Sequence, residues 1–208
     1  MGHVRAIAGD SGMRRLFLLG LVLVLLAIGG MWIYGRWAGP TTSSPVAGFP
    51  EGAATARQAF SLAAGQADQW QDDAGLAAVS CHWPAAGMQA DDQVTWAFQF
   101  FSPSTQRLAF VMVTDGAARL VREGVSPYVV PTLSTEEWRV DSDQALRVWW
   151  ERKGKALAAR RSDIDLTMQL RASDGGGRPV WVVVGMLTSA NTAYTVMVDA
   201  TDGAVVEP

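Results

Sequence analysis

The sequence predicts an α+β fold in which an N-terminal transmembrane helix precedes two units, each made of one helix and an antiparallel sheet. Three observations predict this fold. An uncharged apolar run lies near the N-terminus, and segments that alternate between apolar and polar residues, as half-buried strands do, follow it. The phrase Val-Met-Val, closely followed by Asp-Gly-Ala, also occurs twice, which indicates one unit over 53–125 and a second over 126–208.

The uncharged run, LFLLGLVLVLLAIGGMWIY, covers residues 16–34. At about 1.5 Å per residue it spans roughly 28 Å, close to the hydrocarbon thickness of a bilayer. A signal peptide has a shorter apolar region of about 7–15 residues, so we expect an uncleaved transmembrane anchor over 16–37. Its glycines, Gly20, Gly29 and Gly30, would let another membrane helix approach closely.

The flanking charges predict how the anchor is oriented. Three arginines precede the run (Arg5, Arg14 and Arg15), and only Arg36 follows it closely. Because positive residues stay on the cytoplasmic side, residues 1–15 form a cytoplasmic tail and the chain beyond the anchor lies outside the cytoplasm. Residues 38–52 are rich in Gly, Pro, Ser and Thr, which predicts a semi-extended linker.

The first unit opens with a helix predicted over 54–70, where Ala56, Phe60, Ala63 and Trp70 lie on one apolar face. Strands bounded by turn-forming residues follow it: 75–83, 94–101, 107–113 and 117–121.

The second unit repeats this order after a helix predicted over 141–152, with Asp141 or Ser142 as its N-cap. Its predicted strands are 163–170, 179–186, 193–200 and 204–207. Trp96 and Trp181 stand 85 residues apart, so we expect both tryptophans to be buried to the same extent under the helix of their own unit.

Residues 141–207 resemble the PepSY family of secreted and membrane-anchored bacterial proteins. The ending carries the resemblance through Tyr194, Val196, Val198, Asp199 and Gly203. The resemblance implies a cystatin-like fold for each unit. An anchor followed by two such units also resembles membrane-anchored regulators of cell-wall elongation, which implies a module that binds or inhibits peptidases or envelope enzymes.

Composition and the few reactive residues restrict the chemistry. After residue 40 the chain has 13 Lys and Arg against 19 Asp and Glu, a net charge of −6, which argues against nucleic acid as a partner. His3 lies in the predicted tail, so an external histidine-dependent mechanism would require His82. Its neighbour Cys81 would point to the opposite face of the strand, so we expect a buried, inert thiol and a solvated histidine.

No cofactor or metal site is expected. The chain lacks Cys-x-x-Cys and His-x-x-x-His spacing, and the acidic pairs Asp72-Asp73, Asp91-Asp92 and Asp163/Asp165 are typical of solvated turns as well as of weak calcium contacts. The glycine-rich segment 174–179 joins two strands and does not open a helix, so we expect a hairpin loop and no phosphate site there.

Residues on the second helix are the candidates for binding a partner. Trp149 and Trp150 are about 100° apart on a helix and cannot both face the core. Either both serve core and inter-unit packing, or one of them contacts a partner together with Arg152 and Lys153, whose basic run could also meet acidic lipid headgroups or polymer.

The sequence therefore predicts a single-pass, extracytoplasmic, non-catalytic module that binds a peptidase, a cell-wall enzyme or another envelope protein. Two alternatives stay open. The chain could be an accessory subunit of a larger integral membrane complex, whose anchor packs through Gly20, Gly29 and Gly30. The less favoured alternative is a carboxylate-based hydrolase.

Overall fold

A computed structural model of the chain describes residues 54–83, 94–158, 164–173 and 177–206. The predicted tail, anchor and linker, Gly20, Gly29 and Gly30 included, lie outside the described residues. Within the described ranges no helix is both long enough and apolar enough to cross a membrane.

The first half of the described chain begins with helix α2, Ala56–Trp70, as its apolar spacing predicts. Thr55 is the N-cap, and its hydroxyl accepts from the backbone N–H of Gln58 while the Gln58 side chain accepts from the N–H of Thr55. This reciprocal pair satisfies two N–H groups that the helix itself leaves without partners. The buried residues of α2 are all alanines, which lets the helix backbone lie close to the sheet: Ala56, Ala59, Ala63 and Ala67.

Four antiparallel strands follow α2: β1 Gly75–Trp83, β2 Trp96–Ser102, β3 Arg107–Thr114 and β4 Ala117–Val125. The bounds of β1 are those predicted from its alternation. Strand β4 runs four residues beyond its prediction and contains an irregularity at Val121, which has no partner on β3.

The second half begins with α3, Ser142–Trp149, continues as the π-helical turn η3, Trp150–Gly154, and ends with α4, Lys155–Ala158. Its strands are β5 Ile164–Ala172, β6 Pro179–Leu187, β7 Thr192–Asp199 and the two-residue β8 Val205–Val206.

The predicted arrangement as two cystatin-like units is wrong. All the strands in the described ranges belong to one eight-stranded antiparallel sheet with the order β4-β3-β2-β1-β5-β6-β7-β8. Strands β1 and β5 pair over six residues, from Ala78 opposite Arg171 to Trp83 opposite Leu166. If the two halves formed separate four-stranded sheets, β1 and β5 would each be an exposed edge strand. Their pairing supplies hydrogen-bond partners for the backbone N–H and C=O groups that would otherwise be unpaired at those edges.

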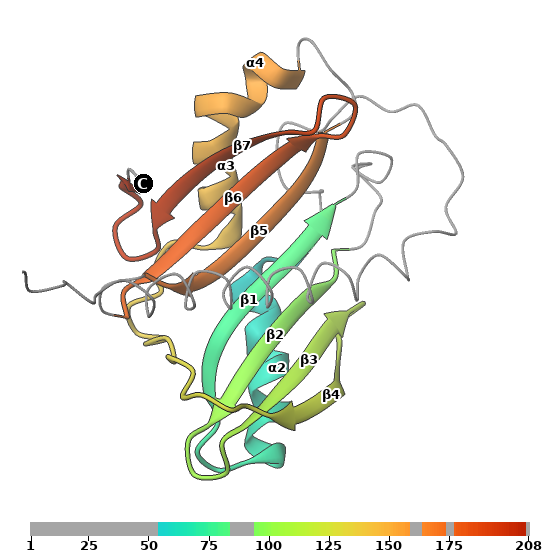
Figure 1. Ribbon diagram of the computed structural model, residues 1–208, viewed down its shortest axis with the longest axis vertical. Coiled ribbons are helices and arrows are strands. Elements are labelled where there is room, and N and C mark those ends of the chain that lie inside the picture. Colours follow the sequence, from blue (N-terminus) through green and yellow to red (C-terminus); the bar gives the residue numbers. More distant parts are fainter. Residues whose placement is uncertain (1–53, 84–93, 159–163, 174–176, 207–208) are drawn as a thin grey trace, which may run out of the picture. The chain divides into compact units, whose positions relative to one another are not determined.

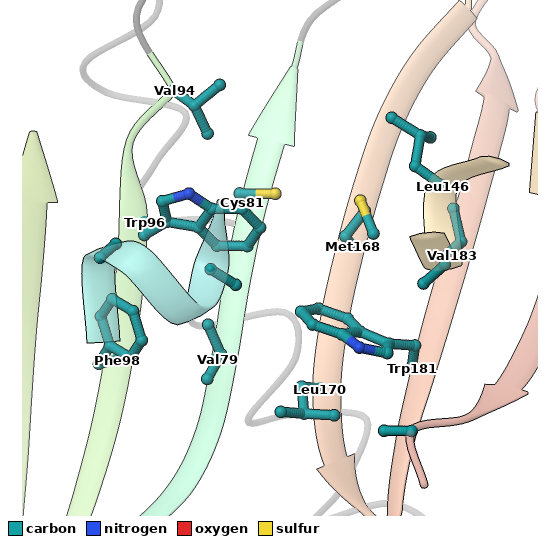
Figure 2. Packing of buried hydrophobic residues seen from close by; sticks show 14 of the residues in the cluster. Val79, Cys81, Val94, Trp96, Phe98, Leu146, Met168, Leu170, Trp181 and Val183 are labelled. Carbon is teal, nitrogen blue, oxygen red and sulfur yellow. The ribbon is translucent and has the colours of Figure 1, made fainter. Parts of the chain in front are cut away.

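One face of this sheet carries the hydrophobic core, and α2 and α3 both contribute to it. In Figure 1, α2 lies along the strands of the first half and α3 along β5–β7. Figure 2 shows side chains from β1, β2, β5 and β6 packing in one layer, among them Cys81, Trp96, Met168 and Trp181. The core is therefore continuous across the β1–β5 junction.

The expected equal burial of Trp96 and Trp181 is confirmed, because both are 0 % exposed. The Trp96 indole donates to the carbonyl of Ala54 at 2.8 Å, and the Trp181 indole donates to the carbonyl of Val140 at 2.8 Å. Both acceptors lie just before a helix N-cap. The two rings meet edge to face at 6.3 Å, so each tryptophan joins its own sheet half to the start of its own helix and also contacts the other tryptophan.

The N-termini of α2 and α3 are joined to each other by hydrogen bonds. Asp141 is the N-cap of α3, and its carboxylate accepts from the backbone N–H of Ser142 at 2.7 Å and from that of Arg57, on α2, at 3.2 Å. The Ser142 hydroxyl accepts from the N–H of Ala56 at 3.0 Å. Two side chains of one helix thus cap the first turn of the other.

The repeated Asp-Gly turn lies at the end of each half. Gly116 and Gly203 have positive φ angles of 71° and 80°, a conformation that glycine adopts without a steric cost. Asp115, which precedes Gly116, also has a positive φ of 55°.

Candidate binding surface

The sheet face opposite the core is the candidate functional site, and we call it the helix-free face because none of the described helices packs on it. Strand pairing sets its residues side by side: Ser80 lies opposite Gln169, and His82 lies opposite Thr167. Continuing the alternation to neighbouring strands gives the rest of this face, all partly exposed: Ala97, Gln99, Phe110, Met112, Val182, Val184 and Met197.

The centre of the helix-free face is polar. His82 Nδ1 and Thr167 Oγ1 are 3.1 Å apart and share a hydrogen bond. Partial burial lowers the pKa of His82, and the nearby Asp165 carboxylate and a backbone hydrogen bond at Leu166 oppose this shift only in part. The imidazole is therefore neutral at pH 7 and can both donate and accept a hydrogen bond.

Apolar side chains flank this polar centre on both sides. Val182, Val184 and Met197 lie on β6 and β7, and Phe110 and Met112 lie on β3. A small second hydrophobic cluster closes the face near the start of β1, where Phe110 and Val130 pack against the buried side chains of Ala77, Phe101 and Leu108. The arrangement is suited to binding, since it combines exposed apolar area with a few placed hydrogen-bonding groups.

The prediction of a buried, inert Cys81 is confirmed. The thiol lies on the core face, 1 % exposed, and burial raises its pKa well above the ordinary value, so it is not a nucleophile at neutral pH. His82 points to the other face of the same strand, which separates the two groups. The histidine differs from its prediction in being partly buried and hydrogen-bonded, because the Thr167 side chain of the adjoining strand β5 lies beside it.

Within the described ranges no group of three or more His, Cys, Asp and Glu could hold a metal ion. Asp73 instead holds the β2–β3 turn: it accepts from the Ser102 hydroxyl at 2.6 Å and from the Ser104 N–H at 2.8 Å, bonds that lower its pKa. Asp91, Asp92 and Asp163 lie outside the described residues.

The four predicted partner-binding residues separate into two environments. Trp149 is 1 % exposed and donates from its indole to the carbonyl of Tyr194 at 3.0 Å, so its side chain belongs to the core. Trp150 is half-buried, and Arg152 and Lys153 are exposed on the π turn. All three residues lie on the π turn, which the periodicity of the sequence did not indicate.

Comparison with family models, with curated proteins and with solved structures finds no match to this chain. The resemblance to the PepSY family therefore stays a prediction.

Proposed function

We propose that the chain is a membrane-anchored, extracytoplasmic and non-catalytic module that binds a peptidase, a cell-wall enzyme or another envelope protein through the helix-free face. The observation that carries the proposal is the composition of this face, in which a hydrogen-bonding centre at His82 and Thr167 lies between apolar side chains of β3, β6 and β7.

The size of the helix-free face supports a protein partner. Six strands from β3 to β7 cover five spacings of about 4.8 Å, or roughly 24 Å, and six residues along a strand add roughly 20 Å. The flat area is about 500 Å², and side-chain relief increases it. A standard protein interface buries about 800 Å² of accessible surface per partner, which is of the same order.

The residues of this face support binding over catalysis. Cys81 is on the opposite side of the sheet from His82, so the two adjacent residues do not form a nucleophile and base pair. His82 is instead held by Thr167 in a position from which it can offer a hydrogen bond to a partner. The location outside the cytoplasm rests on the charges around residues 16–34.

Site-specific photo-crosslinking in cells tests the proposal. A photoreactive phenylalanine analogue replaces Val184, on the helix-free face, in one variant and Leu62, exposed on α2, in a matched control. We expect a discrete crosslinked protein from position 184 and none from position 62. Adding Val182→Arg to the first variant should remove the adduct, because it places a charge at the centre of the apolar flank.

Adducts that form equally at both positions, or that survive Val182→Arg, would contradict the proposed surface. A probe at Gly29 that captures a membrane protein while position 184 captures nothing would favour the alternative of an accessory subunit.

A further inference from the structure

The end of α3 and the π turn after it carry a cluster of positive side chains. Residues 147–155 contain four cations and a single acid, Glu151, although the chain after residue 40 is acidic. All four cations are exposed. Arg147 lies 4.0 Å from Asp143, whereas the other three make no ion pair with any described residue: Arg152, Lys153 and Lys155.

The π turn determines where these cations lie. A Cβ atom at Gly154 would come within 2.6 Å of both the Trp149 and the Trp150 rings, so the backbone there packs directly on the two indoles. Trp149 takes the buried side, and the N–H of Lys155 donates to the carbonyl of Trp150, five residues earlier. Single π turns within α-helices are rare and are frequently found at functional sites.

Trp150 is left half-buried at the rim, with its ring centroid 6.4 Å from that of Trp149. Arg152, Lys153 and Lys155 follow Trp150 within five residues, and all three are exposed. An amphipathic indole close to exposed Lys and Arg side chains is the combination that proteins place at the boundary between lipid and water.

We infer that this surface, formed by Trp150, Arg152, Lys153 and Lys155, rests on an anionic membrane surface. Charge complementarity favours this occupant, since each Lys or Arg close to anionic lipid strengthens attachment roughly fivefold, which gives about a hundredfold for three. Chain length favours it too. Even a fully extended chain of 15 residues, the length of the predicted linker 38–52, reaches only about 50 Å, so the described part would stay near the bilayer in which the proposed anchor lies.

A spin label on the full chain tests this contact. Ala156 is exposed on α4, next to the cations, and is replaced by cysteine and labelled; the buried thiol of Cys81 does not react, as unlabelled wild type verifies. The protein is mixed or reconstituted with vesicles of phosphatidylcholine alone, or of equal parts of phosphatidylcholine and phosphatidylglycerol. Accessibility of the label to a water-soluble nickel chelate is then measured, a readout that works whether or not residues 16–34 insert.

We expect the label at position 156 to be protected from nickel severalfold more in the phosphatidylglycerol vesicles, and a control label at Ser61, on α2, to be unchanged. The triple substitution Arg152→Gln, Lys153→Gln and Lys155→Gln should abolish the protection, as should about 0.5 M salt, where the screening length falls to a few Å.

Equal accessibility in the two lipids, or protection that persists in the triple variant, would overturn the inference. Protection that an acidic polypeptide gives and anionic vesicles do not would also overturn it. None of these outcomes bears on crosslinking from position 184, so the inference and the proposed binding face fail separately.

Discussion

The close contact between Gly185 and the Trp149 ring offers the sharpest test of how the second half is packed. Gly185, on β6, faces this ring, and a Cβ added there would lie 2.2 Å from Trp149 Cζ2. Ordinary contacts begin near 3.4 Å, so the ring would have to move by about 1 Å. It cannot do so freely, because its indole is bonded to the Tyr194 carbonyl and Gly154 packs against its other edge.

We therefore expect Gly185→Ala to lower the free energy of unfolding by about 3 kcal/mol, the upper part of the usual range for overpacking. Trp149→Ala alone should cost about 3–5 kcal/mol through the cavity it leaves. With both changes present the clash is absent, so Gly185→Ala should be close to neutral in the Trp149→Ala background. The expected coupling between the two sites is about 3 kcal/mol.

The assay is urea unfolding of the full chain, followed by tryptophan fluorescence, on the wild type, both single variants and the double variant. Gly124→Ala is the matched control, since this strand glycine has open space around its Cβ position, and its effect should stay within about 0.5 kcal/mol. The proposed contact between Gly185 and Trp149 would be refuted if Gly185→Ala were as stable as the control. It would also be refuted if the changes in unfolding free energy of the two single variants simply added in the double variant.

Three further predictions follow from the helix joints and from His82. Asp141→Ala should cost about 2 kcal/mol in urea unfolding, more than Asp141→Asn, because the carboxylate caps both helices; equal losses would argue against its role as the shared cap. Trp96→Phe should cost about 1 kcal/mol more than Trp181→Phe, because the Val140 carbonyl keeps its bond from Trp138 whereas no other bond to the Ala54 carbonyl is described; the reverse order would contradict this. Burial lowers the pKa of His82, so the unfolded chain binds the proton more readily: as pH falls below about 6.5 the wild type should lose stability relative to His82→Gln, and an NMR titration midpoint above 6.5 would disprove it.

Local features of the sequence predicted local structure well. The alternation of Val79, Cys81 and Trp83 located β1 to the residue and assigned the thiol to the core side. Alanines at helical spacing located α2, and the repeated Asp-Gly located two turns with positive φ. Each of these patterns is complete within about ten residues, so no distant contact was needed to interpret it.

Features that depend on distant contacts were not predicted. Nothing in β1 or β5 alone indicates that the two strands pair. Their alternation is typical of a half-buried strand, and it does not identify which strand lies beside it. Trp138 was assigned to no element, yet it is fully buried between Phe60 and Trp181. A single large apolar side chain within the polar stretch 134–139 was the signal that could have indicated its burial. The helix-free face was missed for a related reason: its members are spaced along separate strands, and only their pairing gathers them.

The central position of β1 also has a consequence for how the chain is made. Its partner β2 is synthesised soon after it, but β5 is not, since Cys81 pairs with Met168, 87 residues later. At a synthesis rate of about 5–20 residues per second, roughly 4–17 s pass between the synthesis of β1 and that of its partner β5. During that interval a long strand stands open to pairing with other nascent chains. We therefore expect a stop codon placed before residue 164 to give an aggregating fragment, and a chaperone that covers this edge to raise the yield of the complete chain.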